Sequence, residues 1–420
     1  MDMIQENLRR YRPKLPIITG RTGGFFVGSF VFYLFANQTQ IGWLYVVSAT
    51  LMGLIFAAYV LNRTVLKGIE VTRRLQPETF ERYENDDLSI TLTINTTRRQ
   101  SSLQLNITEN CLVAPPESDY RDVTMFVPVL PAREGVQFTY NFPIYRRGLY
   151  HFPDVQVSSR APFGLFERKT EIPVKTSLLI YPELRELKCF PLLDKQLAAQ
   201  LANPRTGIGN EVIGVRPYRP GDSPRHIHWR SVARTNRLIS KEFAEETQPG
   251  LTLILDRHCP LNPLPETKHT PFEMAVKAAV SIADYALRQR YPLHLLTSTD
   301  DSAAPSGELS RDVLLQYMAR VQPQNNPVLP ELLKQPGLQQ YVAVVMAWAD
   351  MRVLDTLLSL QAQGAQVLVI LPDVGSFPID VTDTDTNTLM AALASALIPV
   401  RVLRHEDDWS LILSHDPEVG

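Results

Sequence analysis

The pattern of hydrophobic and polar positions begins with a long apolar stretch near the N-terminus. Between Arg21 and Arg63 there is no Asp, Glu, Lys, Arg or His. A helix that crosses the hydrocarbon core of a bilayer needs about 20 apolar residues, so this stretch is long enough for two crossings. The pattern predicts transmembrane helices over about 18–36 and 43–61, joined by a polar turn at 37–42.

Two other interpretations of this stretch are a cleaved signal peptide and a pair of buried helices in a soluble protein. A signal peptide has one short apolar core, whereas two apolar segments follow each other here. A soluble helix usually carries a polar stripe, and neither segment has one. We therefore favour the membrane hairpin.

Basic residues on both sides of the hairpin predict its orientation. The turn has none, and the flanks carry nine: Arg9, Arg10, Arg12, Lys14 and Arg21 before it, and Arg63, Lys67, Arg73 and Arg74 after it. Positive residues are retained on the cytoplasmic side of a membrane. We therefore expect a multi-pass protein of the cell (inner) membrane, anchored by residues 1–68, with its soluble domains in the cytoplasm.

Alternation with a period of two follows the hairpin and predicts β-strands. The pattern is clear at 88–94, 103–107 and 136–144. Apolar residues at every second position face one side of a strand, and the polar residues between them face the other. Short strands with turn residues between them are typical of an antiparallel sandwich, so we predict a β-sandwich-like domain over 69–183.

From residue 251 the pattern changes to apolar runs that alternate with amphipathic segments. The continuous apolar runs predict buried strands at 251–255, 292–296, 341–348, 366–371 and 399–403. Helical spacing predicts helices at 272–289, 311–321, 350–363 and 386–396. Alternating strands and helices imply a parallel sheet covered on both faces. We predict a Rossmann-type α/β domain over 251–420, preceded by a distinct segment over 184–250.

Composition sets limits without indicating a chemistry. The net charge is −2, so no global field favours nucleic acid. Cys111, Cys189 and Cys259 are scattered and form neither a metal-spaced pair nor a disulfide framework. The sequence has no phosphate loop, zinc-hydrolase histidine pair or serine nucleophile elbow, so we assign no catalytic residue and no cofactor.

A locally basic segment with interleaved aromatic residues lies between Gly214 and Glu246. Asp222, Ser223 and Pro224 form a helix-start signal, which predicts a short helix over 224–234 and then a strand over 238–244. A turn at 248–250 then leads into the first strand of the α/β domain. We therefore expect a hairpin here that joins the segment to the edge of the α/β sheet. The segment carries these cations and aromatic residues: Arg216, Tyr218, Arg219, Arg225, Trp229, Arg230, Arg234, Arg237 and Lys241.

Three functional interpretations of this segment compete with a structural one. The arginines allow anion or nucleic-acid binding, but we favour arginines that tie loops to carboxylates and carbonyls. A metal site at His226 and His228 is disfavoured, because an i, i+2 spacing on a helix separates the side chains by about 200°. Three glycines lack the preceding strand and the spacing of a dinucleotide loop: Gly207, Gly209 and Gly214.

In these residues the sequence resembles the membrane proteins of bacteria and archaea that contain the domain of unknown function 58 (DUF 58). The family signature has the form R-x-Y-x-x-G-D-x-x-x-x-I-D-W, and His228 stands where it usually has Asp. Matches upstream are Arg147-Gly148-Leu149-Tyr150 and Pro162-Phe163-Gly164-Leu165-Phe166. The signature matches here, of unknown role, are Arg216, Tyr218, Gly221, Asp222, Ile227 and Trp229, continued by Arg230 and Arg234.

The resemblance implies a membrane hairpin, a β domain and a von Willebrand factor A-like α/β domain. Such A-like domains bind Mg²⁺ through Asp-x-Ser-x-Ser after the first strand. Asp256 matches, but His258 and Pro260 replace both serines. Proline offers no side-chain ligand and histidine suits Mg²⁺ poorly. Asp350 is a possible second carboxylate at the same end of the sheet, but we expect no metal.

The resemblance also bears on partners, because genes of the family often lie beside MoxR-type AAA+ ATPases and transglutaminase-like proteins. The first hypothesis is a membrane-anchored, non-enzymatic interaction or scaffold protein that works with such an ATPase and with other envelope proteins, but not with nucleic acid. The alternative is an enzyme that acts on an anionic or polymeric substrate through the Arg216–Arg234 segment, with Asp222 as its carboxylate.

Overall fold

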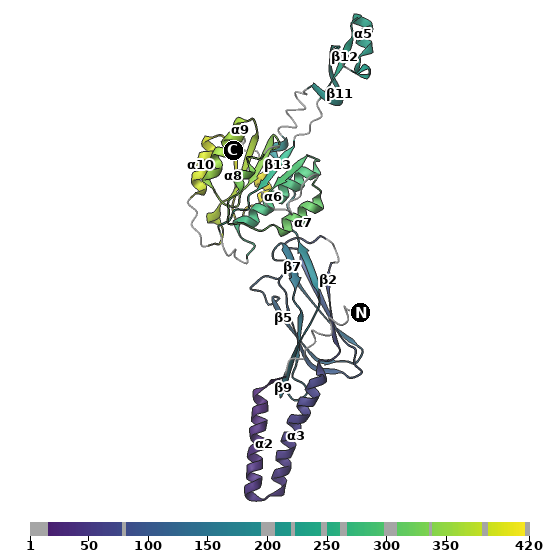
Figure 1. Ribbon diagram of the computed structural model, residues 1–420, viewed down its shortest axis with the longest axis vertical. Coiled ribbons are helices and arrows are strands. Elements are labelled where there is room, and N and C mark those ends of the chain that lie inside the picture. Colours follow the sequence, from purple (N-terminus) through teal and green to yellow (C-terminus); the bar gives the residue numbers. More distant parts are fainter. Residues whose placement is uncertain are drawn as a thin grey trace. The chain divides into compact units, whose positions relative to one another are not determined.

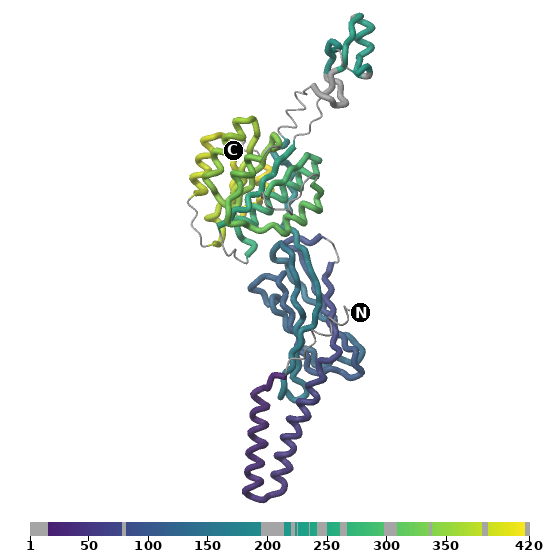
Figure 2. The backbone as a smooth tube through the Cα atoms, viewed as in Figure 1, coloured from purple at the N-terminus to yellow at the C-terminus, as the bar shows by residue number. Residues whose placement is uncertain are grey.

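The computed structural model describes residues 16–77, 81–194, 206–219, 223–244, 250–260, 267–297, 309–335, 338–379 and 385–415. The chain forms two compact units, Met1–Ile180 and Tyr181–Gly420, and each can be followed along the trace in Figure 2. Within them lie an apolar helix pair, antiparallel sheets and a parallel sheet. The N-terminal arginines and Lys14 lie outside the described residues.

The first unit begins with the predicted helical hairpin, formed by α2 (Gly20–Thr39) and α3 (Gly42–Val65) (Figure 1). Gln40 has a left-handed backbone and ends α2, so the turn is shorter than the sequence predicted. Among the described residues, α3 is the one helix that is long and apolar enough to cross a membrane, by length and composition only. A second crossing by α2 is not supported in this way.

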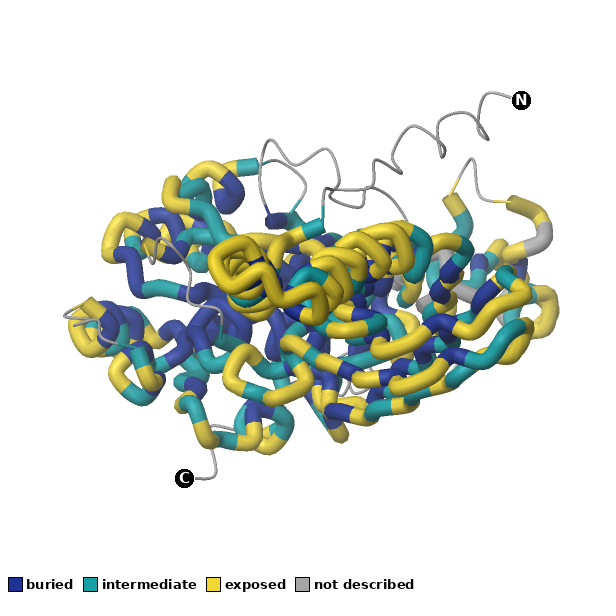
Figure 3. Tube along the Cα trace, turned by 90° about the horizontal axis from the view of Figure 1, so that it is seen from below, coloured by how far each residue is buried: buried dark blue, intermediate teal, exposed yellow. Residues whose placement is uncertain are grey.

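The distribution of side chains around the hairpin is the reverse of that in a soluble helix pair. The helices meet through small and polar side chains. Ser29 Oγ donates to Ser48 O (2.9 Å), and Ser48 Oγ donates to Ser29 O (2.8 Å). Large apolar side chains face outward, and both helices are exposed over most of their length (Figure 3). The outward residues include Phe25, Phe26, Val27, Phe30, Trp43, Val46 and Phe56.

The base of the hairpin is held by the loop before β9 (Phe166–Ile172). Asn62, which is buried, donates from Nδ2 to Ala161 O (2.9 Å) and Phe166 O (3.1 Å). Thr19 Oγ1 donates to Leu165 O at 2.8 Å. The main chain of residues 161–166 therefore connects the hairpin to the β domain.

The remainder of the first unit is antiparallel, and the predicted strands at 88–94, 103–107 and 136–144 are confirmed. One sheet has the order β2-β3-β6, a second has the order β1-β9-β8-β4-β5, and β7 pairs with β10. The first two sheets share one apolar core that includes Val71, Ile94, Ile107 and Val157. The remaining bounds are β1 Ile17–Ile18, β2 Ile69–Gln76, β3 Asp87–Thr96, β4 Ser102–Asn110, β5 Asp122–Leu130, β6 Gly135–Pro143, β7 Gly148–Phe152, β8 Val155–Ser159 and β10 Thr176–Ile180.

The second unit contains a parallel sheet of the five predicted strands, in the order β14-β13-β15-β16-β17. Its central strands are continuous apolar runs because they are buried on both faces. Their bounds are β13 Leu251–Leu255, β14 Leu293–Leu296, β15 Tyr341–Val345, β16 Gln366–Pro372 and β17 Val400–Leu403.

Helices cover the parallel sheet. One face of the sheet packs against α8 (Leu329–Leu332), α9 (Leu354–Ala362) and α10 (Thr386–Ser395) in a single core cluster. Helix α6 (Pro271–Arg288) contacts the sheet together with α7 (Arg311–Arg320) and α11 (Trp409–Ser414). The helix predicted over 350–363 is split into a 3-10 turn, Met351–Val353, and α9.

The segment before the parallel sheet differs from the prediction. Strands β11 (Thr206–Pro217) and β12 (Ile239–Ala244) form their own two-stranded antiparallel sheet. The expectation that a hairpin joins this segment to the edge of the α/β sheet is therefore wrong, because β12 pairs with β11. The predicted strand over 238–244 is present, but its backbone groups pair with β11, which the sequence pattern did not single out.

Candidate functional site

The parallel sheet places two aspartates at the same end, beyond the carboxyl ends of its strands. Strand β13 lies between β14 and β15, so the chain leaves it toward one side of the sheet and β15 lies on the other. This arrangement is a topological switch point, where open α/β sheets bind ligands beyond the carboxyl ends of the strands. Asp256 directly follows β13, and Asp350 follows β15 after a short loop.

Asp256 is a buried carboxylate, with only 3% of its surface exposed. Its backbone N–H donates to Val345 O (2.8 Å), and its Oδ1 accepts a hydrogen bond from His258 N (3.0 Å). Its Oδ2 has no hydrogen-bond partner in the described part of the chain. Burial, and secondarily the charge of Asp350, raises the pKa of Asp256 to about 7, so a proton competes with ionisation at neutral pH.

Asp350 is bound by a neighbour within its own loop. Arg352 Nη2 lies 2.8 Å from Asp350 Oδ2, and Arg352 Nε contacts both carboxylate oxygens at 2.9 and 3.1 Å. Burial opposes ionisation of Asp350, but the hydrogen bonds and charge of Arg352 outweigh it and lower the pKa of Asp350. The two aspartates at the switch point therefore have opposite tendencies: Asp350 stays ionised, whereas Asp256 tends to hold a proton.

The residues at this edge do not fit the Mg²⁺ site that the resemblance implies. His258 offers an imidazole whose Nδ1 is buried without a hydrogen-bond partner, and burial lowers the pKa of His258. Asp350 is already occupied by Arg352, and proline stands at position 260. Within the described residues, no group of three or more His, Cys, Asp or Glu side chains is placed to hold a metal.

The signature segment forms a short ribbon capped by a helix. Residues Pro224–His226 make a 3-10 turn, and α5 spans Trp229–Thr235 (Figure 1). The helix predicted over 224–234 is therefore interrupted at Ile227, which is buried and pairs with Ser240 of β12. Tyr218 N donates to Leu238 O at 3.0 Å. Gly221 and Asp222 lie outside the described residues.

The histidine that departs from the family signature has a local structural role. His228 is the N-cap of α5, and its Nδ1 accepts a hydrogen bond from Ser231 N (3.2 Å) and lies 2.7 Å from Ser231 Oγ. An Asp at this position is a strong helix cap for the same reason, since its side chain accepts from the first turn. Neither His226 nor His228 belongs to a metal-ligand group among the described residues.

The sequence predicted that arginines of this segment tie loops together, but three of them do not do so among the described residues. Arg230, Arg234 and Arg237 are exposed, and none forms an ion pair within the described part of the chain. Arg216 is half-buried, and its Nη1 donates to Pro217 O at 3.2 Å. Trp229 is also exposed, so the segment presents its indole and these three arginines outward.

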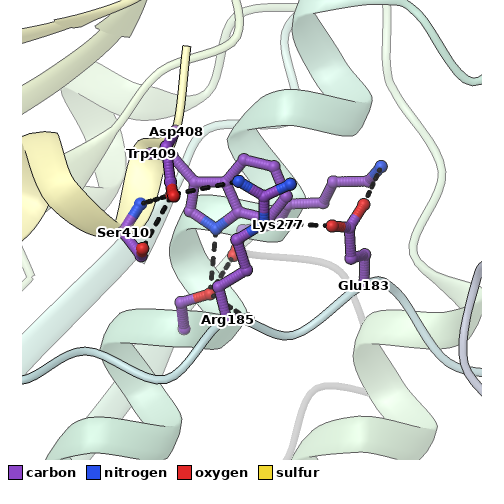
Figure 4. A network of polar contacts seen from close by, with 7 residues as sticks. Glu183, Arg185, Lys277, Asp408, Trp409 and Ser410 are labelled. Carbon is purple, nitrogen blue, oxygen red and sulfur yellow. Dashed lines mark hydrogen bonds and ion pairs between the residues drawn. The ribbon is translucent and has the colours of Figure 1, made fainter. Parts of the chain in front are cut away.

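A second charged cluster was not singled out by the sequence pattern. Arg185 lies over the ring of the buried Trp409, with its Cζ 3.9 Å from the ring centroid, and its Nη1 lies 3.0 Å from Asp408 Oδ1. Lys277 of α6 pairs with Glu183 at 3.3 Å (Figure 4). These contacts attach the segment that opens the second unit to α6 and α11. No helix was predicted at α11; the apolar residues Trp409 and 411–413 were the signal that could have located it.

A cavity of about 230 Å³ adjoins this cluster and includes a pair of histidines. His405 Nε2 and His269 Nδ1 are 2.8 Å apart. Burial lowers the pKa of His269, and the nearby His405, Lys268 and Lys277 lower it further. A neutral His269 is therefore favoured at pH 7, as a hydrogen bond between two imidazoles requires one nitrogen without a proton.

Comparison with known proteins finds one family model that is similar to part of this chain. Residues 214–395 match the family described as "Protein of unknown function DUF58". The DUF58 match begins near the end of β11 and covers β12, α5 and the parallel sheet through α10. A curated relative, "Uncharacterized protein YeaD" from Bacillus subtilis (strain 168), is 24% identical over 197 residues, which is 46% of this chain and 48% of the relative. The chain thus spans about half the length of that relative.

Solved structures add little to the DUF58 match. A putative ApaA protein from Bordetella pertussis is 14% identical, with a TM-score of 0.17 over 27% of this chain and 91% of that chain. An exo-β-N-acetylglucosaminidase from Vibrio harveyi is 10% identical, with a TM-score of 0.20 over 73% of this chain and 57% of that chain. Likeness of this degree carries no argument about fold or function.

Proposed function

We propose that this chain is a membrane-anchored, non-enzymatic interaction or scaffold protein that works with a MoxR-type AAA+ ATPase. The observation that carries the proposal is the hairpin, whose small polar residues face inward while its aromatic and aliphatic residues face outward. Water would penalise that arrangement and hydrocarbon favours it. In this proposal the parallel sheet is a von Willebrand factor A-like domain and the antiparallel sheets form a β-sandwich-like domain.

Both helices cross the membrane in this proposal. Helix α2 has no charged side chain after Arg21 and exposes a row of aromatic residues. Its reciprocal serine hydrogen bonds with α3 satisfy polar groups that lipid cannot solvate. Because the two helices are antiparallel neighbours joined by a tight turn at Gln40, a crossing by α3 carries α2 with it.

The chemistry of the candidate site supports binding over catalysis. Asp350 is paired with Arg352 and Asp256 is buried, and the hydroxyl ligands of a Mg²⁺ site are replaced. A catalytic acid or base has to reach a substrate proton, and only 3% of the surface of Asp256 is exposed. The partner assignment rests on the resemblance to DUF 58 proteins.

We expect the turn of the hairpin to face away from the cytoplasm. In a Cys189→Ser background, Gln40→Cys in intact cells should react with a membrane-impermeant maleimide. Asp355→Cys, on an exposed position of α9, should react only after the membrane is permeabilised, because basic residues flank the hairpin on the side of the soluble domains. Labelling of both cysteines, or of Asp355→Cys alone, in intact cells would contradict the proposed topology.

We expect an AAA+ ATPase to be retained by the full chain. The tagged protein, extracted from native membranes in a mild detergent, should elute with the ATPase encoded by the same organism. The purified ATPase should then bind the chain in phosphatidylcholine nanodiscs, but not empty nanodiscs. If the purified pair showed no binding with or without ATP, the proposed partner would be rejected.

A further inference from the structure

The signature segment ends in an exposed surface that the proposed function does not yet use. We define the arginine tip as Trp229, Arg230, Arg234, Arg237 and Leu238, which lie on α5 and the turn that follows it. We propose that the arginine tip docks an acidic segment of a partner protein. This inference rests on the proposed role as an interaction module and specifies the chemistry of the partner.

The first observation is apolar exposure on a small element. Trp229 is 64% exposed and Leu238 is 50% exposed, although α5 is only seven residues long. Other contacts attach α5 to the ribbon and complete its first turn: the backbone of Ile227 pairs with that of Ser240, and His228 caps the helix. The exposed indole is therefore not needed to hold α5 against β12. Trp and Arg are the residues that most often dominate binding energy at protein interfaces.

The second observation is unneutralised charge. Arg230 and Arg234 are four residues apart, so they are neighbours on the helix surface, where like charges destabilise a helix. Arg230 also lies in the first turn of α5, at the positive end of the helix dipole. Within the described residues, neither forms an ion pair, nor does Arg237. Carboxylates from a partner would remove both sources of repulsion.

The type of cation favours carboxylates held in defined positions. The stretch 216–241 contains six arginines and one lysine: Arg216, Arg219, Arg225, Arg230, Arg234, Arg237 and Lys241. Asp222 is its one acidic residue. A guanidinium group binds a carboxylate through two parallel hydrogen bonds, whereas an ammonium group acts as a point charge. A stretch whose cations are almost all arginine is suited to directional recognition more than to diffuse attraction.

The shape of the arginine tip favours a protein over lipid or nucleic acid. Helices that lie on a membrane surface bury a broad apolar face, whereas α5 exposes one aromatic side chain together with two arginines. Single-stranded nucleic acid is bound by successive aromatic platforms, and Trp229 stands alone on this helix. An acidic protein segment with an apolar residue matches both the guanidinium groups and the indole.

The test uses the full chain in phosphatidylcholine nanodiscs and a fluorescein-labelled peptide that contains glutamate and phenylalanine. The matched peptide carries glutamine in place of every glutamate. Fluorescence anisotropy should show binding of the acidic peptide that weakens as salt is added and is absent for the glutamine peptide. The variant Arg230→Glu/Arg234→Glu/Arg237→Glu and the variant Trp229→Ala should each weaken binding by at least about tenfold.

The matched control is Arg320→Glu, which reverses an exposed arginine at the end of α7 and should leave binding unchanged. The inference is overturned if the acidic peptide binds no better than its glutamine analogue, or if Arg320→Glu weakens binding as much as the arginine-tip variants. It is also overturned if phosphatidylglycerol vesicles or a single-stranded oligonucleotide bind through the arginine tip and the peptide does not.

The same variants separate this inference from the proposed function. If the AAA+ ATPase binds the charge-reversed chain as tightly as the unaltered chain and the peptide does not bind, the arginine tip is rejected and the proposed partner stands. If the peptide binds through the arginine tip but no ATPase is retained, the proposed partner is rejected and the surface stands.

Discussion

Replacing Glu109 with Gln is expected to destabilise the β domain by about 3–5 kcal/mol, because it leaves a buried arginine without its counter-charge. Glu109 of β4 pairs with Arg73 of β2, and both side chains are fully buried. Tyr140 Oη donates to Glu109 Oε2 at 2.7 Å. The carboxylate thus joins three strands that belong to two different sheets. After substitution, the described partners of Arg73 would all be neutral: an amide oxygen at position 109, two backbone carbonyls and the ring of Phe152.

Amide hydrogen exchange of the full chain in detergent micelles, resolved by mass spectrometry, measures this change in the peptides of β4 and β6. Glu70→Gln is the matched control, since Glu70 is exposed on β2 and should change stability by less than about 0.5 kcal/mol. Equal exchange in the two variants would refute the prediction. Replacing the whole cluster, by Arg73→Met/Glu109→Leu/Tyr140→Phe, should restore part of the lost protection because no unpaired charge remains.

The same cluster illustrates what the sequence pattern could predict. Period-two alternation located β3, β4 and β6, because one face of each strand is buried. It could not identify Glu109 as a core residue, since a carboxylate among apolar positions usually faces solvent. Only the pairing of two sheets brings Arg73, Glu109 and Tyr140 together. The buried charge is a property of the tertiary arrangement.

Local signals were predictive where the neighbouring residues alone decide the structure. Gly364 has a positive φ and ends the helix at the predicted place, because glycine tolerates that conformation. The helix-start signal at 222–224 was less reliable. The described part of the segment shows a 3-10 turn followed by a second cap at His228. Histidine is an uncommon cap, so nothing in the sequence ranked it above Asp222.

Contacts made through backbone carbonyls left no trace in the sequence. Asn62 and Thr19 hold the hairpin by donating to main-chain oxygens of residues 161–166, and any residue can supply such an acceptor. The pairing of β11 with β12 is also made through backbone groups. The sequence pattern therefore did not indicate that β12 pairs with β11 and not with the edge of the parallel sheet. The exposed state of Arg230, Arg234 and Arg237 likewise depends on where acidic partners lie in three dimensions.

Asp256 and Asp350 show how far the candidate site could be predicted. Their positions after two parallel strands follow from the order of apolar runs, and the structure places both at the switch point. Their opposite ionisation preferences do not follow from the sequence. The pKa of Asp256 is raised chiefly by its burial, whereas Arg352 reaches Asp350 and lowers the pKa of that carboxyl. Both effects depend on tertiary geometry.

Removing the carboxylate of Asp256 is therefore expected to change how stability depends on pH. The folded-state pKa of about 7 lies above the ordinary value of 3.8. Between these values the unfolded chain has released the proton and the folded chain has kept it, so the unfolding free energy falls as pH rises and levels off above pH 7. The full cost approaches about 4 kcal/mol, at 1.36 kcal/mol for each pKa unit.

Asp256→Asn lacks this titration but keeps an oxygen that can accept from His258 N. Its unfolding free energy should exceed that of the unaltered chain above pH 7, and the advantage should shrink toward pH 4. Urea unfolding of the full chain in micelles, in a Trp43→Phe/Trp229→Phe background, follows the α/β unit through Trp348 and the buried Trp409. Asp355→Asn, at an exposed position, is the control and should retain the original pH slope. If Asp256→Asn retained the original pH slope as well, titration of the buried Asp256 carboxylate would not be the source of the pH dependence.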